Sequence, residues 1–347
     1  MQILKKYPLL IAEISANHNG KLENALNLIS EAKKYGADLI KLQTFTPKNM
    51  TLDTHKDKFI LKEGIWKNKS LFDLYKKGQT PYHWHKIIFD FCREKKISCF
   101  STPFHEEDVD FLETLKCPMY KVASFELNYL NLIKKIAKTK KPIILSTGMA
   151  NLNEIEIAFN TAKKYGASEI IILYCVSNYP AKNKDFNLNN INFLKKKFKC
   201  RVGLSDHSTD NEIVKAAVAS GATIIEKHIA LRKEKKALDY DFSLKDKEIE
   251  VFKSDIVNTY NLLGKNFFYR EKIEFKNRKF RRSIFTSKAI KKGEKFTKHN
   301  LQVLRPAIGI SPYYFEKLLK QKSPFNLKKN YHLPKKLIKN LKLDLKS

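Results

Sequence analysis

Three segments of the chain repeat one pattern, in which the end of an amphipathic helix is followed by Gly-Ala and a short apolar run. They lie at residues 32–44, 162–174 and 217–228. Gly36, Gly166 and Gly221 stand where a helix commonly ends in a left-handed residue. The apolar run that follows has the length of a strand buried on both faces. The repeat therefore predicts helix–strand units of an α/β protein.

Apolar runs of this kind predict eight strands, at Leu9–Ile14, Leu39–Thr44, Cys99–Pro103, Met119–Ser124, Pro142–Thr147, Ile170–Cys175, Arg201–Asp206 and Thr223–His228. Helical patterns lie between most of them, at Leu22–Tyr35, Trp84–Lys95, Asp108–Leu115, Leu130–Lys138, Asn153–Tyr165 and Glu212–Ser220. Eight such units favour a (β/α)8 TIM barrel, while a doubly wound parallel sheet is the alternative. The insertion at residues 46–81 is long for a loop of this fold and has the size of an active-site lid.

The pattern changes after Gly264 and predicts a second domain. Residues 270–282 are dense in charge, and we expect a linker over residues 266–282 after a barrel domain of residues 1–265. Short β-type runs follow at Ser283–Ser287 and Leu301–Leu304, so residues 283–347 are expected to form a small, mostly β domain with a Lys-rich tail.

Composition narrows the class of protein. The chain has 347 residues, 43% of them hydrophobic, which excludes disorder along its whole length. Lys and Arg number 67 against 36 Asp and Glu, a net charge of +31, yet only eight of the 67 are Arg. Because base readout and phosphate clamping favour Arg, the charge predicts a Lys-rich surface and no specific nucleic-acid partner. A basic nucleic-acid- or polysaccharide-binding protein with an inactive barrel remains the alternative.

Cysteine usage and hydropathy predict the compartment. The five cysteines are odd in number and include no C-x-x-C pair, which indicates buried thiols in a reducing environment. No run approaches the roughly 18 apolar residues of a membrane span. We therefore expect a cytoplasmic protein with no membrane partner.

Candidate chemistry lies at the strand ends, where barrels of this kind place their active sites. The polar residues there are Glu13, Lys41, Gln43, Ser101, Thr102, Lys121, Ser124, Ser146, Thr147, Ser177, Ser205, Asp206, His207, Glu226 and His228. Two lysines and several hydroxyls in one mouth predict an anion site, most naturally for a phosphate and a carboxylate. Glu13 is a candidate acid or base, or a salt-bridge partner of a lysine. Lys41 or Lys121 could instead form a Schiff base, as in class I aldolases.

His207 and His228 end neighbouring strands of the predicted barrel. Two imidazoles so placed can face each other within metal-ligand range, although a structural role for one of them is the alternative. With oxygen ligands completing the shell, the pair predicts a divalent metal such as Mn²⁺ or Mg²⁺, acting as a Lewis acid.

These strand ends belong to longer motifs that resemble the sialic acid synthase family in order and spacing, to about residue 320. The motifs are Ala12–Gly20, Lys41–Thr44, Ser101–Phe104, Tyr120–Glu126, Leu145–Met149, Gly203–His207 and Glu226–His228. Arg282-Ser283, Ile290–Glu294 and Leu304–Pro306 resemble that family's antifreeze-like (SAF) domain. Residues 80–85 and 305–312 look most like the pseudaminic acid synthase branch, although His83 replaces its usual Glu. Sister enzymes make N-acetylneuraminate or legionaminate.

The resemblance implies condensation of phosphoenolpyruvate with the open-chain aldehyde of a 2,4-diacetamido-2,4,6-trideoxy hexose, giving a nine-carbon 2-keto acid and phosphate. It implies that His207 and His228 hold the metal and that Glu13 serves the proton step. It assigns the phosphate to Lys41, Ser124, Ser146, Ser177 and Ser205, and the carboxylate to Thr102 and Lys121. It assigns the sugar to Gln43, Glu126, Tyr179, Asp239 and Arg305.

Two features of the C-terminal domain follow from the same resemblance. Arg305 would reach the barrel of a partner subunit, which implies a domain-swapped homodimer. Asn330 stands where the family usually has Gly, and an Asn can adopt the left-handed conformation that such a turn needs.

Overall fold

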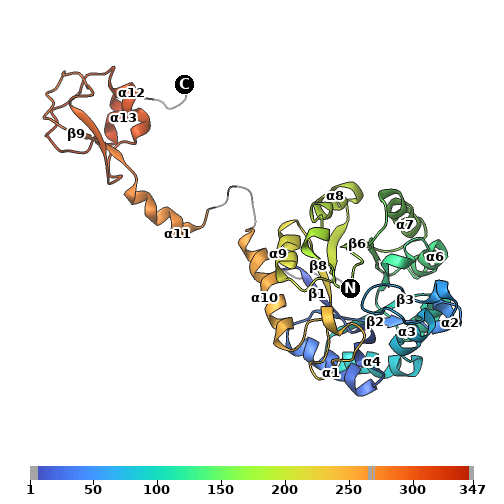
Figure 1. The fold of residues 1–347 in the computed structure, drawn as a ribbon. Coiled ribbons are helices and arrows are strands. Elements are labelled where there is room, and N and C mark those ends of the chain that lie inside the picture. Colours follow the sequence, from blue (N-terminus) through green and yellow to red (C-terminus); the bar gives the residue numbers. More distant parts are fainter. Residues whose placement is uncertain (1–6, 265–267, 269, 344–347) are drawn as a thin grey trace. The chain divides into compact units, whose positions relative to one another are not determined.

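The computed structural model describes residues 7–264, 268 and 270–343. The chain divides into two compact units, Met1–Gly264 and Lys265–Ser347, and each is described by itself (Figure 1). The expected domain boundary at residue 265 and the first residues of the expected linker, 266 and 267, lie outside the described residues, as do residues 344–347 of the tail.

The first unit is a closed barrel of eight parallel strands, which confirms the predicted (β/α)8 fold and excludes the doubly wound sheet. Each strand pairs with its neighbour in sequence, and β8 closes on β1. The strands are β1 (Leu9–Glu13), β2 (Leu39–Thr44), β3 (Ser98–Pro103), β4 (Tyr120–Val122), β5 (Ile143–Ser146), β6 (Ile170–Cys175), β7 (Arg201–Asp206) and β8 (Ile224–His228).

Helices surround the strands, as Figure 1 shows. They are α1 (Leu22–Lys34), α4 (Tyr82–Glu94), α5 (Glu106–Thr114), α6 (Leu130–Lys138), α7 (Leu152–Lys164), α8 (Asn189–Phe198), α9 (Asn211–Ala219) and α10 (Lys247–Leu262). The helical patterns named from the sequence did not include α8 or α10. Tertiary packing stabilises both helices, because Ile191 and Leu194 of α8 are buried, as are Ile249, Phe252 and Ile256 of α10.

The repeated glycines end helices as predicted. Gly36, Gly166 and Gly221 have φ angles of 91°, 97° and 98°. These angles belong to the left-handed region, where a side chain would be strained, so each glycine lets the chain leave its helix and enter the next strand.

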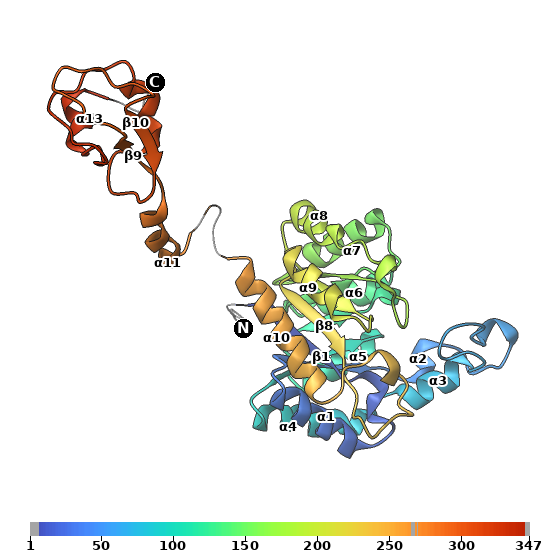
Figure 2. The same cartoon turned by 60° about the vertical axis from the view of Figure 1, so that its left-hand side comes forward.

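The expected lid is ordered around two short helices, α2 (Pro47–Met50) and α3 (Leu71–Gly78). Between them, Ile60 and Ser70 form an antiparallel bridge that closes a small hairpin. Figure 2 shows this segment extending away from the ring of helices. The hydroxyl of Ser70 accepts a hydrogen bond from the backbone N–H of Asp73 and so caps α3.

The second unit has its own small core. Strands β9 (Ser283–Thr286) and β10 (Leu301–Leu304) pair antiparallel, and helices α11 (Lys272–Phe275), α12 (Phe315–Leu318) and α13 (Lys336–Asn340) accompany them. Helix α11 lies within the expected linker. Asn330 has a φ of 57°, which confirms the predicted left-handed turn. The Lys-rich tail packs through Leu337 of α13, which is fully buried.

Hydropathy and cysteine pairing were also predicted from the sequence. In the part of the chain that the structure describes, none of the helices combines the length and apolar character that crossing a membrane requires. All five cysteines are free thiols, and four of them are buried.

Candidate active site

A cavity of about 430 Å³ opens at the carboxyl ends of the barrel strands. The residues predicted for the site that line it are Lys41, Gln43, Lys121, Ser124, Glu126, Ser146, Ser177, Tyr179, Ser205, His207, His228 and Asp239. Parallel strands end at one rim of a barrel, so side chains far apart in sequence converge there. Arg305 belongs to the second unit, where its side chain is exposed.

The two lysines are held by buried carboxylates. The ammonium group of Lys121 donates to both oxygens of Glu226, at 2.8 and 2.9 Å. Lys41 pairs with Glu13, lies 3.4 Å from Glu226 and donates to the hydroxyl of Thr102 at 3.2 Å. Glu13 and Thr102 are fully buried and are not among the residues that line the cavity. Glu13 and Thr102 therefore hold Lys41 from outside the cavity, while Lys41 and Lys121 line it.

Electrostatics within this cluster act differently on its members. Burial opposes ionisation of Glu226, but Lys121 and Lys41 outweigh burial and hold the pKa of this carboxyl well below its usual range. Burial also opposes the charge on Lys41, but Glu13 and Glu226 raise its pKa, whereas burial lowers the pKa of Lys121 despite its pair with Glu226. An anion that enters the cavity thus meets a favoured ammonium charge at Lys41.

Hydroxyl groups complete the anion side of the cavity. Ser205 donates to Glu226 at 3.1 Å, and the hydroxyl of Ser146 is buried without a hydrogen-bond partner. The backbone N–H of Gly148 donates to Ser124 at 3.0 Å. A Cβ at Gly148 would lie 2.0 Å from the hydroxyl oxygen of Ser177 and 2.8 Å from that of Ser124. Only a glycine therefore allows these two serines to lie so close to the loop after β5.

The loop after β5 leads into α7 through an ordinary helix cap. The side chain of Asn151 accepts from the backbone N–H of Glu154 at 3.0 Å, and the Glu154 carboxylate accepts from the N–H of Asn151 at 2.8 Å. This capping box satisfies backbone N–H groups of the first turn of the helix, as an ordinary cap does.

His207 and His228 face the same cavity, with ring centroids 5.4 Å apart. Nδ1 of His207 lies 3.1 Å from the carbonyl oxygen of Val176. Since a carbonyl only accepts, Nδ1 carries the hydrogen, and Nε2 of the neutral ring keeps its lone pair for a ligand. Nδ1 of His228 is buried without a hydrogen-bond partner and lies 3.4 Å from a carboxylate oxygen of Asp239.

This donor set fits a divalent metal that takes its other ligands from substrate or water. Two imidazoles are typical ligands of such ions, and an orphaned buried ring nitrogen is costly unless something binds it. Among the described residues, no group of three or more His, Cys, Asp or Glu side chains is placed to hold a metal by itself. What the described residues offer a metal is therefore the pair of imidazoles of His207 and His228.

The side of the cavity near the imidazoles combines aromatic and polar groups. The ring of Tyr179 packs 4.4 Å from that of His207, and Phe242 lies 5.0 Å from His228. Glu126 follows β4 in the turn Ser124–Glu126, and one of its carboxylate oxygens has no hydrogen-bond partner. Burial raises the pKa of Glu126 to about 7. This carboxyl can therefore hold or release a proton near neutral pH.

Sequence reasoning missed the roles of two residues in this cavity. Glu226 was noted as a strand end but received no role, although it joins both lysines and Ser205. Cys175 was interpreted only as a buried thiol, yet it lines the cavity and lies 3.8 Å from both Ser177 and His207. The only available signal was their position at the ends of β8 and β6.

The motif at residues 80–85 supports the site from outside the cavity. His85 is buried and lies 2.8 Å from the hydroxyl of Thr44 at the end of β2, and 3.1 Å from the carbonyl of Pro81. Burial lowers the pKa of His85 to about 4, so the ring is neutral. Thr80 lies 3.4 Å from His18 in the turn after β1. These contacts fasten the end of the lid to β1 and β2.

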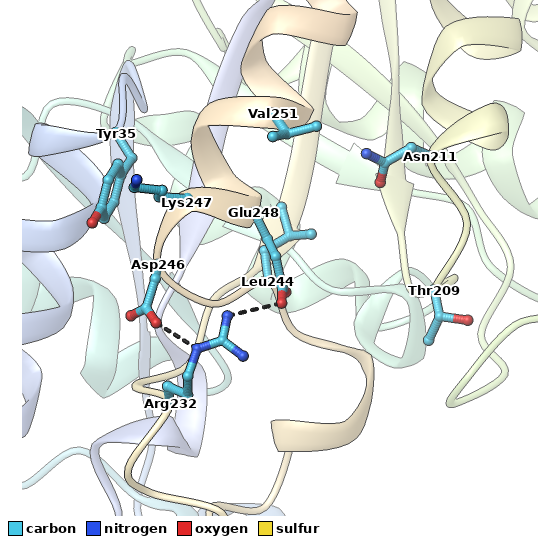
Figure 3. Close-up of a pocket in the computed structure, with 9 residues that line it drawn as sticks. All are labelled: Tyr35, Thr209, Asn211, Arg232, Leu244, Asp246, Lys247, Glu248 and Val251. Atoms are coloured by element: carbon cyan, nitrogen blue, oxygen red, sulfur yellow. Dashed lines mark hydrogen bonds and ion pairs between the residues drawn. The ribbon is translucent and has the colours of Figure 1, made fainter.

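A second hollow, of about 590 Å³, lies apart from the cavity at the strand ends and carries none of the predicted site residues. Figure 3 shows Arg232 between Asp246 and Glu248 there, with donor–acceptor distances of 2.6 and 3.0 Å. Lys247 also lines this hollow, but Arg232 is already paired with two carboxylates.

Comparison with known proteins places these features in context. A model of the NeuB family matches residues 28–267, and a model of the SAF domain matches residues 281–329. The chain is 43% identical over 319 residues to a pseudaminic acid synthase of Campylobacter jejuni, covering 92% of this chain and 93% of that protein. It is 39% identical over 329 residues to an N,N'-diacetyllegionaminic acid synthase of the same species, covering 94% and 98%. The structure of an N-acetylneuraminic acid synthetase from Leptospira borgpetersenii, in complex with citrate, matches with a TM-score of 0.71 and 29% identity, covering 80% of this chain and 93% of that chain.

Proposed function

The chain belongs to the NeuB family and carries a C-terminal SAF domain, and from this premise we propose that it is a pseudaminic acid synthase. As a family member it is a nonulosonic acid synthase, a transferase that forms a carbon–carbon bond with phosphoenolpyruvate. The finer proposal concerns the acceptor, which is the aldehyde form of a 2,4-diacetamido-2,4,6-trideoxy hexose. The 43% identity to the Campylobacter jejuni pseudaminic acid synthase supports this choice of sugar.

One observation carries the chemical part of the proposal: a single cavity joins an anion side to a pair of imidazoles. Lys41, Lys121 and the serines at positions 124, 146, 177 and 205 would bind the phosphate and carboxylate of phosphoenolpyruvate. Glu226 holds both ammonium groups in place before the substrate arrives. The unpartnered hydroxyl of Ser146 is a donor that a phosphate oxygen would satisfy.

The imidazoles define where the aldehyde would bind. His207 and His228 would hold a divalent ion, Mn²⁺ or Mg²⁺, which when bound polarises the aldehyde oxygen. The hydrogen bond from His207 to Val176 orients its ring, and Asp239 lies beside His228. Gln43, Glu126 and Tyr179 line the cavity on this side and would contact the sugar.

The reaction needs three proton movements. When C3 of phosphoenolpyruvate attacks the aldehyde carbon, the aldehyde oxygen gains a proton and becomes a hydroxyl group. Water then adds to C2 and loses one proton, which leaves C2 with a hydroxyl group and the phosphate. The C2–O bond to phosphate breaks as this hydroxyl group passes its proton to the departing phosphate, and the 2-keto acid remains. Glu13, paired with Lys41 below the cavity, would accept the proton from water. Glu126 would serve on the sugar side, where its pKa of about 7 lets it exchange a proton.

The acceptor is tested by phosphate release from phosphoenolpyruvate in the presence of Mn²⁺. We would compare 2,4-diacetamido-2,4,6-trideoxy-altrose, the legionaminate-type isomer and N-acetylmannosamine. The proposal expects the highest kcat/KM for the altrose. Preference for the isomer would favour a legionaminate synthase, the second candidate, which the 39% identity to the Campylobacter jejuni enzyme of that name supports.

Metal dependence is tested in the same assay. EDTA should abolish turnover and added Mn²⁺ should restore it. Turnover that survives exhaustive chelation would instead favour Schiff-base chemistry at Lys41 or Lys121.

We also propose a homodimer in which the second unit of one chain completes the cavity of its partner. Arg305 would contact the sugar, and the exposed apolar residues Leu304, Ile308 and Tyr313 next to it are suited to an interface. Mixing Arg305→Ala with His228→Ala chains, followed by subunit exchange, separates the two arrangements. In a swapped dimer the mixed dimer regains one intact site, so activity at low sugar concentration returns. If each chain completes its own site, no activity returns.

A further inference from the structure

The lid, residues 46–81, turns an apolar surface toward the cavity. Six of its side chains line the cavity and form what we call the apolar wall: Met50, Leu61, Trp66, Leu71, Leu74 and Tyr75. The lid also carries many lysines and several acidic residues, yet none of its charged side chains lines the cavity. The lid therefore presents apolar and not charged side chains to the cavity, although the chain as a whole is rich in Lys.

The wall is held in place at its centre. The indole N–H of Trp66 donates to the carbonyl oxygen of Leu238 at 3.1 Å, and its ring packs 5.5 Å from that of Tyr179. Tyr179 in turn packs against His207. Trp66 thus anchors the wall beside the imidazoles, where the aldehyde would bind.

Other strand ends extend the apolar surface. Phe45 and Phe104 pack edge to face at 5.3 Å, and both line the cavity. Phe125 also lines it and is 61% exposed, which is unusual for a large aromatic side chain in a folded barrel. A ligand that covered Phe125 and the wall would remove this apolar area from water.

We propose that the apolar wall is the specificity-determining subsite for the methyl groups of the acceptor sugar, namely its deoxy C6 and its acetamido methyl carbons. The inference rests on the proposed function, because it assumes that the sugar binds on the side of the imidazoles. A hydroxyl group placed against these side chains would lose its hydrogen bonds to water and find no partner. A methyl group in the same position would gain contact area. A hydrophobic surface of this kind discriminates by roughly 10- to 200-fold in kcat/KM.

The experiment compares the trideoxy diacetamido sugar with N-acetylmannosamine, which has hydroxyl groups at C4 and C6. Leu61→Asn places a polar group in the wall, while the backbone bonds of the hairpin at Leu61, to Lys69 and Asn68, do not involve its side chain. We expect kcat/KM for the trideoxy sugar to fall about 10-fold or more, the ratio between the two sugars to fall with it, and KM for phosphoenolpyruvate to stay unchanged. Leu74→Asn should act in the same direction.

The matched control is Leu52→Asn, because Leu52 belongs to the same lid but is exposed and is not among the residues that line the cavity. It should leave both sugars unaffected. A ratio that stays at its wild-type value in both wall variants would overturn the inference. If the wild-type enzyme releases no phosphate with any sugar, the proposed function itself fails, and that result is distinct from an unchanged ratio.

Discussion

Glu126→Gln tests whether burial in the cavity sets the protonation state of this carboxyl. Burial raises the pKa of Glu126 from 4.5 to about 7, and one of its carboxylate oxygens has no hydrogen-bond partner. In the unfolded chain the carboxyl loses its proton near pH 4.5, whereas the folded protein keeps it until about pH 7. The folded state therefore binds more protons within that window, and its stability falls as the pH rises through it.

The size of the effect follows from the two pKa values. One pH unit of difference corresponds to about 1.4 kcal/mol, so the folded protein loses about 3 kcal/mol between pH 4.5 and pH 8.5 through this group. A glutamine cannot ionise. The free energy of unfolding of Glu126→Gln relative to wild type should therefore be about 3 kcal/mol higher at pH 8.5 than at pH 4.5.

The assay is urea unfolding followed by tryptophan fluorescence at the two pH values. Trp66 and Trp84, the two tryptophans of the chain, both lie in the barrel, so the signal reports that unit alone. Glu63→Gln is the control, because its side chain is exposed on the lid and does not line the cavity; its unfolding free energies at the two pH values give the baseline for Glu126→Gln. If the difference in unfolding free energy between Glu126→Gln and wild type is the same at both pH values, burial does not hold this proton.

Three further predictions concern the anion side and the imidazole pair. Glu226→Gln removes the shared partner of two buried lysines and should lower the free energy of unfolding by about 3 kcal/mol. Phosphoenolpyruvate should stabilise this variant more than wild type in urea titrations, and equal stabilisation would contradict the assignment. Gly148→Ala places a Cβ against Ser177 and Ser124, so KM for phosphoenolpyruvate should rise at least 10-fold with the sugar KM little changed. His228→Ala should abolish Mn²⁺ binding measured by calorimetry while the circular dichroism spectrum stays that of wild type, and retained binding would remove His228 from the metal site.

The barrel was predictable because its signals are local. A strand buried on both faces must be a continuous apolar run, and a helix that ends before such a strand needs a left-handed residue, here Gly36, Gly166 and Gly221. The strands over residues 39–44, 170–175 and 201–206 consequently have the bounds that their patterns predict. Helices α8 and α10 were not among the patterns named from the sequence, and tertiary packing of their buried apolar residues stabilises both.

In the candidate site, too, the sequence predicted some features and could not predict others. The residue types at the strand ends, two lysines, several serines and two histidines, were visible in the sequence, and the barrel geometry implied that they meet. Their partners could not be read from the sequence. Glu226 joins Lys121, which is 105 residues away, and Trp66 donates to Leu238, which is 172 residues away.

The sequence by itself thus determined the architecture and the kind of chemistry, because both depend on residue type and spacing along the chain. Only the tertiary structure decided how the charges pair, why the pKa of Glu126 is raised and which side chains of the lid line the cavity. These properties depend on burial and on distances between residues remote in sequence. Desolvation and Coulomb energies vary with distance in space, and a pattern of neighbours along the chain does not encode that distance.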